Sequence, residues 1–361
     1  MNSVLVTGGA GFIGSSFVRH LLHRAPGTRV TNLDALTYAG SLENLSDLPG
    51  PEHHRFVEGD IRDQGLVEEL LRQEAVDTVV HFAAETHVDR SIADPSPFVE
   101  TNVIGTLTLL EAARHVWLEE RPEQHADRRF LQVSTDEVYG SLEVEDAPAC
   151  ETSPYRPNSP YAASKAASDH FARAFSRTYG LPVLIANCSN NYGPRQFPEK
   201  LIPLTILNAR EGKPIPVYHT GQQIRDWIHV DDCCEALLGL LHRGRIGESY
   251  NIGGGSQTTN LEVVERVCSL MDDLSPDSPN APHRRLIEFV ADRPGHDRRY
   301  ALDISKLQTE LGWAPHWELG DGLRKTVEWY LGNSSWLEAI QTRPSFRHWI
   351  VRNYTDRKRL A

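Results

Sequence analysis

The 361-residue sequence contains little that would place it in a membrane or export it. No run approaches the roughly 18 consecutive apolar residues that a membrane-spanning helix needs. The start of the chain has neither a basic segment nor an apolar core typical of a signal peptide. We therefore expect a cytoplasmic protein with no membrane partner.

Cysteine and positive charge are also scarce. The five cysteines show no CxxC spacing, which supports neither a zinc site nor a disulfide framework. They predict free thiols in a reducing compartment and no bound metal. Lys and Arg total 37 against 49 Asp and Glu, a net charge of −12, which argues against nucleic acid as a partner. A phosphate-bearing ligand must then be held by a local arrangement of groups.

The first half of the chain instead shows a regular alternation of short apolar strands and helices. Such alternation is typical of an α/β protein with a Rossmann-type, doubly wound parallel sheet. The chain exceeds the roughly 250–300 residues of a single core, so we expect a second, smaller α/β domain. Strands are predicted at 3–7, 30–34, 55–60, 78–82, 129–133 and 183–186, and the two longest helices at 97–116 and 161–179.

A glycine motif follows the first predicted strand. Gly8, Gly11 and Gly14 form GxxGxxG before a helix, where backbone N–H groups can approach a pyrophosphate. Asp34 stands twenty residues beyond Gly14, at the end of the next strand. A carboxylate there suits the two ribose hydroxyls of NAD and repels a 2′-phosphate. The sequence therefore predicts NAD as the cofactor.

The third predicted strand ends at a second polar position. Asp60 and Ile61 are placed to meet the adenine of the cofactor. The alternative is that Asp60 caps the helix that follows.

Past about residue 190 proline and glycine become frequent, which indicates a change of domain. We assign residues 1–190 to the NAD-binding domain, with 226–253 returning to it. Residues 191–225 and 254–361 form the partly interleaved substrate domain and a C-terminal tail. The tail mixes aromatic side chains with arginines, and we expect its basic end to be a solvated segment.

Two groups of residues predict the chemistry. Tyr161 and Lys165 share one helix face, and Thr135, Asp136 and Glu137 stand at the C-terminal end of the fifth strand, where open α/β sheets bind ligands. A tyrosine whose pKa is lowered by a nearby ammonium and by the cofactor's positive charge can act as a base near neutral pH. Lys165 would supply that field and hold the nicotinamide ribose. The alternatives are an exposed Tyr–Lys pair and carboxylates that cap the next turn.

These motifs carry a family resemblance. Residues 7–14 with the Tyr161 and Lys165 pair resemble the nucleotide-sugar branch of the extended short-chain dehydrogenase/reductase superfamily, and the match is close to its dTDP-glucose 4,6-dehydratase family. The resemblance spans roughly residues 3–330. Related epimerases and decarboxylases share the glycine motif and the Tyr/Lys pair but typically lack the adjacent Asp-Glu pair. The other matching segments are DALTYAG at 34–40, HFAAETHVDRS at 81–91, STDEVYG at 134–140, NNYGP at 190–194, EKLIP at 199–203, IRDW at 224–227 and DRPGHD at 292–297.

The resemblance implies a lyase that converts dTDP-glucose to dTDP-4-keto-6-deoxyglucose in deoxysugar biosynthesis. Oxidation at C4 makes the C5 proton acidic, so that a second base and an acid are needed. By resemblance, Glu137 takes the C5 proton, Asp136 protonates the departing C6 hydroxyl, and Thr135 hydrogen-bonds the C4 oxygen and positions Tyr161. The hydride moves from C4 to NAD⁺ and returns to C6, so the cofactor should stay bound.

The resemblance also supplies the predicted binding residues. Arg225, Arg293 and His296 can neutralise a diphosphate, with surface ion pairs as the alternative, and Pro216, Tyr218 and Asn260 match positions that bind the base. The predicted cofactor contacts are Gly8, Gly11, Phe12, Ile13, Gly14, Asp34, Ala35, Leu36, Thr37, Asp60, Ile61, Phe82, Ala83, Ala84, Thr86, Thr101, Tyr161, Lys165 and Asn191. The predicted substrate contacts are Thr86, Thr135, Asn190, Lys200, Leu201, Pro216, Tyr218, Arg225, Asn260, Arg293 and His296.

The sequence departs from the family pattern at three places. His219 stands where glycine is usual, so a positive φ there would strain the backbone and narrow the base pocket. Thr86 replaces serine and keeps the hydroxyl, and residues 144–150 resemble a short insertion.

The rival functions are a 4,6-dehydratase for UDP- or GDP-linked sugars, a nucleotide-sugar 4-epimerase, and a non-catalytic NAD-binding sensor. A homodimer is expected, because the two long helices carry apolar residues on more than one face and family members pair them into a four-helix bundle.

Overall fold

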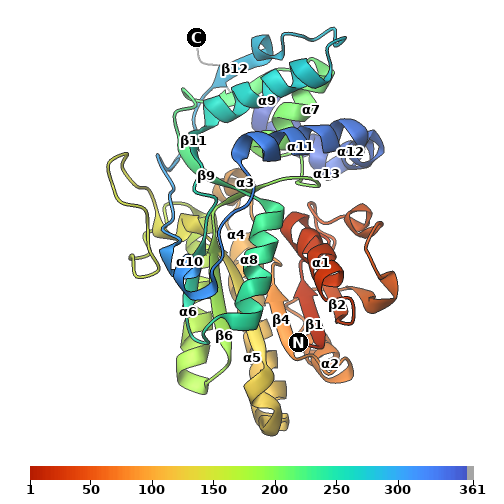
Figure 1. The fold of residues 1–361 in the computed structure, drawn as a ribbon, viewed down its shortest axis with the longest axis vertical. Coiled ribbons are helices and arrows are strands. Elements are labelled where there is room, and N and C mark those ends of the chain that lie inside the picture. Colours follow the sequence, from red (N-terminus) through yellow and green to blue (C-terminus); the bar gives the residue numbers. More distant parts are fainter. Residues whose placement is uncertain (356–361) are drawn as a thin grey trace.

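The computed structural model describes residues 1–355 and is built around one large sheet (Figure 1). Its seven strands are all parallel and run in the order β10-β6-β5-β4-β1-β2-β3. Because the order reverses between β1 and β4, a crevice opens there at the carboxyl ends of the strands. The doubly wound parallel sheet predicted from the sequence is confirmed. The strands are β1 (Ser3–Thr7), β2 (Arg29–Asp34), β3 (His54–Glu58), β4 (Thr78–His81), β5 (Arg129–Thr135), β6 (Val183–Cys188) and β10 (Ser249–Ile252).

Helices cover both faces of this sheet, as is usual for parallel strands, and they bury the central strands on both sides. Val4 and Val6 of β1 point to a core that includes α1 (Phe12–Arg24) and α8 (Val230–Arg243). Leu5, between them, points to the opposite core. On this opposite face the core is formed with three other helices and one π-helical turn. They are α2 (Gln64–Gln73), α5 (Thr106–Arg114), α6 (Pro160–Tyr179) and η4 (His115–Glu120).

The helix predicted at 97–116 is longer and less regular than expected. It runs from Ser96 to Glu120 through wide π-helical turns. Asn102 lies in the first of these turns, where its side chain accepts from the Glu85 amide at 2.8 Å and donates to Ser164. Such bulges often accompany functional sites. The first two segments of this helix are α4 (Ser96–Phe98) and η3 (Val99–Gly105), and the short helix α3 (Val88–Ala93) precedes it.

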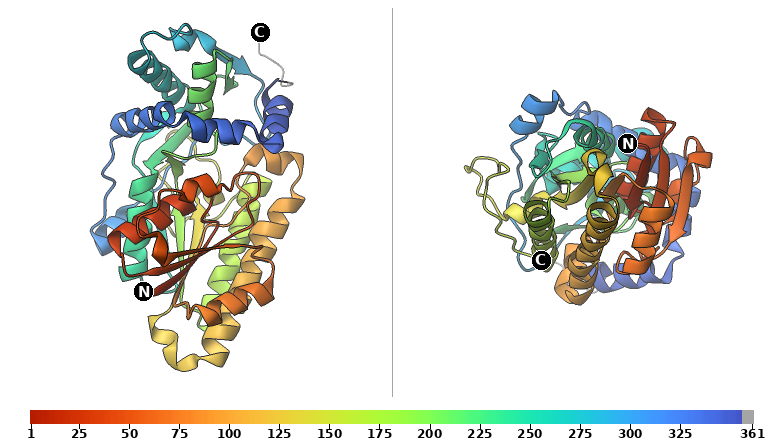
Figure 2. Two further views of the ribbon diagram at one scale, coloured as in Figure 1. Left: turned by 90° about the vertical axis from the view of Figure 1, so that its right-hand side faces the viewer. Right: turned by 90° about the horizontal axis from the view of Figure 1, so that it is seen from below.

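A smaller unit sits over the carboxyl ends of the large sheet (Figure 2). It holds a three-stranded sheet in the order β11-β9-β7 and a pair β12-β8, with helices packed around one core. The segment 226–253 was predicted to return to the NAD-binding domain. Within it, α8 packs on the large sheet and β10 is one of its strands, whereas residues 226–229 belong to a strand of the smaller unit, β9. The elements are β7 (Asn190–Tyr192), α7 (Leu201–Glu211), β8 (Ile215–Tyr218), β9 (Ile224–His229), β11 (Gln257–Thr259), α9 (Asn260–Leu274), β12 (Ile287–Val290) and α11 (Leu319–Gly332).

The remaining elements are short. Most are single helical turns that join the larger ones, and α10 packs beside β10. They are η1 (Leu42–Leu45), η2 (Pro51–His53), η5 (Pro122–Asp127), η6 (Asp136–Tyr139), η7 (His283–Leu286) and α10 (Ser305–Leu311).

The C-terminal tail is folded through residue 355. It forms α12 (Ser334–Gln341), α13 (Pro344–Ile350) and the turn η8 (Val351–Thr355). Trp336, Phe346 and Trp349 are all buried, because each helix is amphipathic and turns its aromatic side toward the neighbouring core. The solvated basic end expected at residues 356–361 lies outside the described residues.

Between residues 1 and 355, no helix is both long and apolar enough to cross a membrane.

Candidate active site

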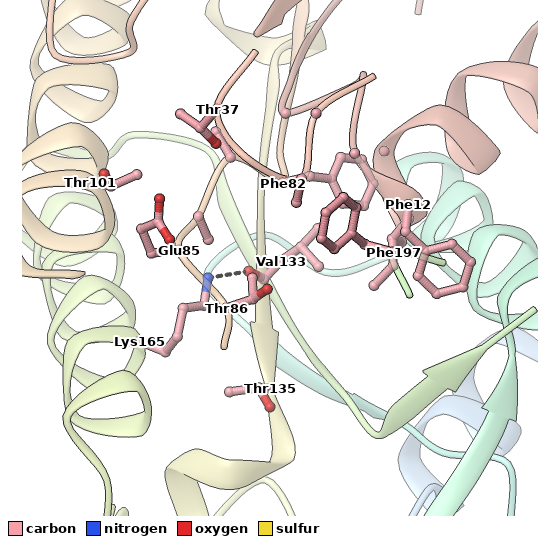
Figure 3. Close-up of a pocket in the computed structure, with 18 of the residues that line it drawn as sticks. Phe12, Thr37, Phe82, Glu85, Thr86, Thr101, Val133, Thr135, Lys165 and Phe197 are labelled. Carbon is pink, nitrogen blue, oxygen red and sulfur yellow. Dashed lines mark hydrogen bonds between the residues drawn. The ribbon is translucent and has the colours of Figure 1, made fainter. Parts of the chain in front are cut away.

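A cavity of about 350 Å³ opens at the carboxyl ends of β1, β2, β4 and β5 (Figure 3). Both units contribute to it, since Phe12 and Phe82 come from the large sheet side and Phe197 from the smaller unit. The crevice at the point where the strand order reverses is the expected ligand site of an open α/β sheet.

The glycine turn forms one end of the cavity. Gly8 has φ +71°, and a Cβ there would stand 2.5 Å from the amide nitrogen of Ala83. A Cβ on Gly14 would collide with the carbonyl oxygen of Gly8. The turn therefore requires glycine at both positions, and it leads into the N-terminus of α1, where backbone N–H groups favour a phosphate.

Asp34 lies at the end of β2 with its carboxylate fixed. The two oxygens accept hydrogen bonds from the amides of Ala10 at 2.9 Å and Leu36 at 2.8 Å. Asp34 lines the cavity, and each of its oxygens retains capacity to accept a further hydrogen bond. A carboxylate fixed in this way can accept hydrogen bonds from the two adjacent hydroxyls of a ribose.

The alternative role for Asp60 as a helix cap is wrong. The N-cap of α2 is Asp63, which accepts from the amide of Leu66 at 3.0 Å. Asp60 lines the cavity and pairs with Arg62 at 2.7 Å.

The structure brings the predicted cofactor residues together. All of them line the cavity except Leu36, which lies just behind it in a left-handed conformation with φ 48°. Among the labelled side chains of Figure 3, Thr37, Thr101 and Thr86 face the same space.

Thr135, Asp136 and Glu137 stand at the end of β5 and the start of η6. The Thr135 hydroxyl accepts from the Glu137 amide at 3.3 Å and donates to Asp136 Oδ1 at 3.2 Å. Asp136 and Glu137 both line the cavity, and burial raises the pKa of each carboxyl. Two buried carboxyls with raised pKa values are suited to proton transfer near neutral pH.

Tyr161 and Lys165 lie in the first turns of α6, and Ser159 is the N-cap of this helix. The Ser159 hydroxyl caps the helix by accepting from the Ala162 amide at 3.1 Å. Both functional side chains are buried, so the alternative of an exposed Tyr–Lys pair is wrong. Lys165 donates to the carbonyl of Val133 at 2.7 Å (Figure 3), which fixes its ammonium at the cavity wall.

The pKa of Tyr161 is raised by the protein, not lowered. Burial is the largest cause, and the charge of Glu137 adds to it, while the Thr135 hydroxyl acts in the opposite direction. Burial also lowers the pKa of Lys165. The predicted lowering of the tyrosine pKa therefore needs an additional positive charge in the cavity.

Part of the predicted substrate set lines the same cavity. Thr86, Thr135, Asn190 and Lys200 line it. Lys200 donates to the Thr86 carbonyl at 2.9 Å. Leu201 is the first residue of α7.

The remaining predicted substrate residues lie in the smaller unit, outside that cavity. Arg293 lines an adjoining cavity of about 220 Å³, together with Asp89 and Trp349. Tyr218, two residues after Pro216 on β8, donates to Asp89 at 2.6 Å. Asn260 begins α9.

Two of the predicted diphosphate ligands differ in their surroundings. Arg225 is not in a surface ion pair, because it is buried, donates to the carbonyls of Ile224 and Asp297, and lies 4.3 Å over the ring of Tyr300. His296 does pair with Asp292, at 2.6 Å.

His219 has φ 50°, the left-handed conformation expected for a position where glycine is usual. Its amide donates to the carbonyl of Val290 at 2.8 Å, which ties the turn after β8 to β12.

The sequence analysis missed residues that support the catalytic groups from far along the chain. Tyr300 donates to Asp297 at 2.5 Å and lies 3.4 Å from Glu137 Oε2. Arg90 pairs with the buried Glu199 at 3.0 Å. Arg90 and Glu199 lie within matched segments, but nothing in the local sequence pairs them, and Tyr300 lies in no matched segment.

Comparisons with known proteins agree with this geometry. The family described as GDP-mannose 4,6 dehydratase matches residues 5–326. A dTDP-glucose 4,6-dehydratase of Xanthomonas campestris pv. campestris (strain B100) is 56% identical over 94% of this chain and 96% of its own. The structure of a dTDP-glucose 4,6-dehydratase from Streptomyces venezuelae, with NAD and TYD bound, is 49% identical with TM-score 0.84, covering 94% of this chain and 99% of that one. A UDP-glucose 4-epimerase from Thermotoga maritima is 30% identical with TM-score 0.79, covering 92% and 99%.

Proposed function

We propose that this chain, which belongs to the dTDP-glucose 4,6-dehydratase family, converts dTDP-glucose to dTDP-4-keto-6-deoxyglucose and water. The observation that carries the proposal is one cavity that holds Tyr161, Lys165 and the adjacent acids Asp136 and Glu137. An epimerase needs the tyrosine but has no use for a second acid and base. A dehydratase needs all of them, since it must also remove a C5 proton and a C6 hydroxyl.

NAD fits the residues that are present. The glycine turn leaves no room for a Cβ, the N-terminus of α1 faces the cavity, and Asp34 presents a fixed carboxylate to a ribose diol. When bound, NAD⁺ accepts the hydrogen of C4 as hydride and later returns it to C6. Its positive charge would also supply the lowering of the Tyr161 pKa that the protein groups do not provide.

The chain's own residues divide the proton transfers. Tyr161 takes the proton of the C4 hydroxyl, and Thr135 orients that oxygen from the end of β5. Glu137 then removes the C5 proton, which the new C4 ketone has made acidic, while Asp136 protonates the departing C6 oxygen. The proton on Glu137 exchanges with water, and Glu137 then donates a solvent-derived proton to C5 when the hydride reaches C6, so one residue acts first as base and then as acid.

The nucleotide would extend from this cavity toward the adjoining one. Arg293 borders the smaller cavity, and its positive charge acts on the pKa of Glu137, which lines the larger one. Lys200 and Arg225 add positive charge near the same carboxylate. A guanidinium can hold a diphosphate bidentately, which suits a sugar nucleotide. The strained turn at His219 follows Tyr218 at the predicted base site.

Product analysis on a panel of substrates tests the reaction and the choice of nucleotide. The NAD-loaded protein would receive dTDP-, UDP-, GDP- and CDP-linked glucose and mannose, and mass spectrometry would follow each sugar. We expect loss of one water, fastest with dTDP-glucose. Faster loss of water from a UDP- or GDP-linked sugar would reassign the substrate, and an unchanged mass with a new stereoisomer would establish an epimerase. No turnover with NAD bound would favour a sensor.

We further propose that the protein is a homodimer that pairs η3 and α6 with their copies. These elements lie side by side (Figure 2) and expose Val99 by 50%, Ile104 by 43%, Phe171 by 37% and Tyr179 by 49%. Burying such a patch in an interface is favourable. Size-exclusion chromatography with light scattering should give twice the chain mass, and Phe171→Glu should shift it toward the monomer. Phe289→Glu, 40% exposed on β12, is the matched control and should leave the dimer intact.

We also propose a cytoplasmic location and a role in deoxysugar biosynthesis. The support for the location is that all five cysteines are free thiols, as expected in a reducing compartment. Residues 1–190 with 226–253 would bind NAD, and residues 191–225 with 254–361 would bind the sugar nucleotide.

A further inference from the structure

The loop of residues 35–46, here called the ribose loop, follows Asp34 and forms one wall of the cofactor cavity. Ala35, Thr37, Ala39 and Gly40 all line that cavity. Apart from the single turn η1 the loop has no regular structure, and Leu36 holds a left-handed conformation that a leucine adopts only under constraint. Contacts from outside the loop must therefore hold it in place.

The C-terminal helices supply such contacts to the far half of the ribose loop. Arg343, at the start of α13, donates to the carbonyl of Gly40 and to the hydroxyl of Ser41, each at 2.7 Å. The Arg343 side chain also lies 3.4 Å from the carboxylate of Glu43. A guanidinium that bonds three neighbouring groups of one loop fixes the position of that loop with charge-assisted hydrogen bonds.

A second chain of contacts runs from α12 to the glycine turn. The indole N–H of Trp336 donates to Asn44 Oδ1 at 2.8 Å. Asn44 in turn donates to the carbonyl of Ala10 at 2.9 Å, and the amide of Ser41 donates to the same carbonyl at 3.0 Å. Trp336 and Asn44 are both buried, so this chain is shielded from water. It joins the C-terminus, the ribose loop and the phosphate turn.

The near half of the ribose loop is held by aromatic packing. The Arg90 guanidinium lies between two rings, 3.9 Å from the centroid of Tyr38 and 4.3 Å from that of Trp349 on α13. Phe346, also on α13, meets Phe197 edge-on at 5.6 Å, and Phe197 meets Tyr38 at 5.7 Å. Both halves of the loop are therefore fastened to helices more than 290 residues away in sequence.

We propose that the segment 336–349 is a cofactor clamp, which keeps NAD resident by holding the ribose loop closed over it. Arg343 and Trp336 act as positioning residues in this clamp, since they touch the loop and not the cofactor cavity. The inference rests on the proposed function, in which each turnover returns the cofactor to its starting state. An enzyme of that kind has no need to release NAD between turnovers. Figure 2 shows the blue C-terminal helices at the level where the two units meet, next to this loop.

The exchange of bound NAD tests the clamp without any sugar substrate. The holoenzyme is mixed with an excess of isotopically labelled NAD, and the replacement of unlabelled cofactor is followed by mass spectrometry of the rapidly filtered protein. We expect Arg343→Ala to exchange about tenfold faster, the order expected for losing hydrogen bonds to a charged group. Trp336→Phe keeps the ring but loses the donor, and should change exchange in the same direction. Arg343→Lys should restore part of the retention.

The matched control is Arg347→Ala on the same helix. Arg347 is exposed, and among residues 1–355 its side chain donates only to the carbonyl of Gln341, within the C-terminal segment itself. The Arg347→Ala variant should exchange NAD at the rate of the wild type, and thermal unfolding should show that all variants remain folded. Unchanged exchange in Arg343→Ala and Trp336→Phe, or an equal acceleration in Arg347→Ala, would overturn the clamp alone. A wild-type protein that binds no NAD would overturn the proposed function and the clamp together, so the two failures are distinguishable.

Discussion

Asp136 and Glu137 are neighbours in the chain and both are buried, yet the charges that act most strongly on their pKa values differ in sign. Burial is the main reason that the pKa of Asp136 lies well above its ordinary value, and the negative charges of Glu137 and Asp226 raise it further. Burial also raises the pKa of Glu137, but the positive charges of Arg293 and Arg225 lower it and so oppose the effect of burial. Asp136 therefore keeps its proton to higher pH, as an acid must, and Glu137 loses its proton first, as a base must.

The raised pKa of Asp136 predicts a stability that depends on pH. Because folding raises this pKa, the contribution of Asp136 is fully present below the ordinary carboxyl range and is lost as the pH rises through the raised value. Asp136→Asn removes the titration, so the variant should gain thermal stability relative to the wild type as the pH rises from about 5 to about 9. Thermal unfolding at several pH values measures this. A difference that stays constant across the range would contradict the assignment.

Glu137→Gln should separate oxidation from dehydration. The variant retains Tyr161 and can still oxidise C4, but it lacks the base for C5, so water loss should slow by about 10²–10⁴-fold. Acid quench during the first turnover, followed by mass spectrometry, should show a sugar that has lost two hydrogens and no water. Glu143→Gln changes an exposed carboxylate that pairs with Arg298 and should behave as the wild type. Dehydration at a normal rate in Glu137→Gln would move the base elsewhere.

Tyr161→Phe should block the first proton transfer while leaving substrate binding largely intact. We expect kcat to fall by about 10²–10⁴-fold, with little change in the dissociation constant of dTDP-glucose. Steady-state kinetics and calorimetric titration measure the two quantities. Tyr179→Phe, at the exposed end of the same helix, is the control. Near-normal turnover in Tyr161→Phe would exclude it as the base.

Gly14→Ala should reduce cofactor binding, because its Cβ would collide with the Gly8 carbonyl and push the phosphate turn out of place. The overpacking should also destabilise the fold by about 1–3 kcal/mol. Gly27→Ala meets nothing within 4 Å and is the matched control. The fraction of purified protein carrying NAD, together with denaturant unfolding, measures both effects. Equal NAD content in the two variants would show that the turn does not hold the pyrophosphate.

The sequence predicted those parts of the site that depend on local patterns. The glycine turn requires Gly8 and Gly14 within a few residues of one another, and Tyr161 and Lys165 meet because one helix carries both. The strands were found because each is a short apolar run between polar turns. In each case the structural cause lies within one or two adjacent elements.

Contacts between residues that are far apart in the sequence could not be predicted from such local patterns. Tyr300 approaches Glu137 across 163 residues, and no local spacing indicates the pair. The sequence did not indicate what the C-terminal helices contact, since Arg343 donates to the carbonyl of Gly40 and Trp336 to Asn44, about 300 residues away in each case. The irregular helix at 96–120 was predicted as regular, since π-helical turns leave no clear signal in a single sequence.

The fates of the C4 and C5 hydrogens, followed in two labelling reactions, test the central claim most directly. The holoenzyme would convert dTDP-glucose carrying deuterium at C4 in ordinary water, and unlabelled dTDP-glucose in D₂O, with the products assigned by mass spectrometry and NMR. The account predicts that the C4 deuterium appears at C6 without dilution, that C5 carries one solvent deuterium in D₂O, and that one water is lost. A product with unchanged mass, or one in which C5 keeps its original hydrogen, would contradict the roles of Glu137 and Asp136.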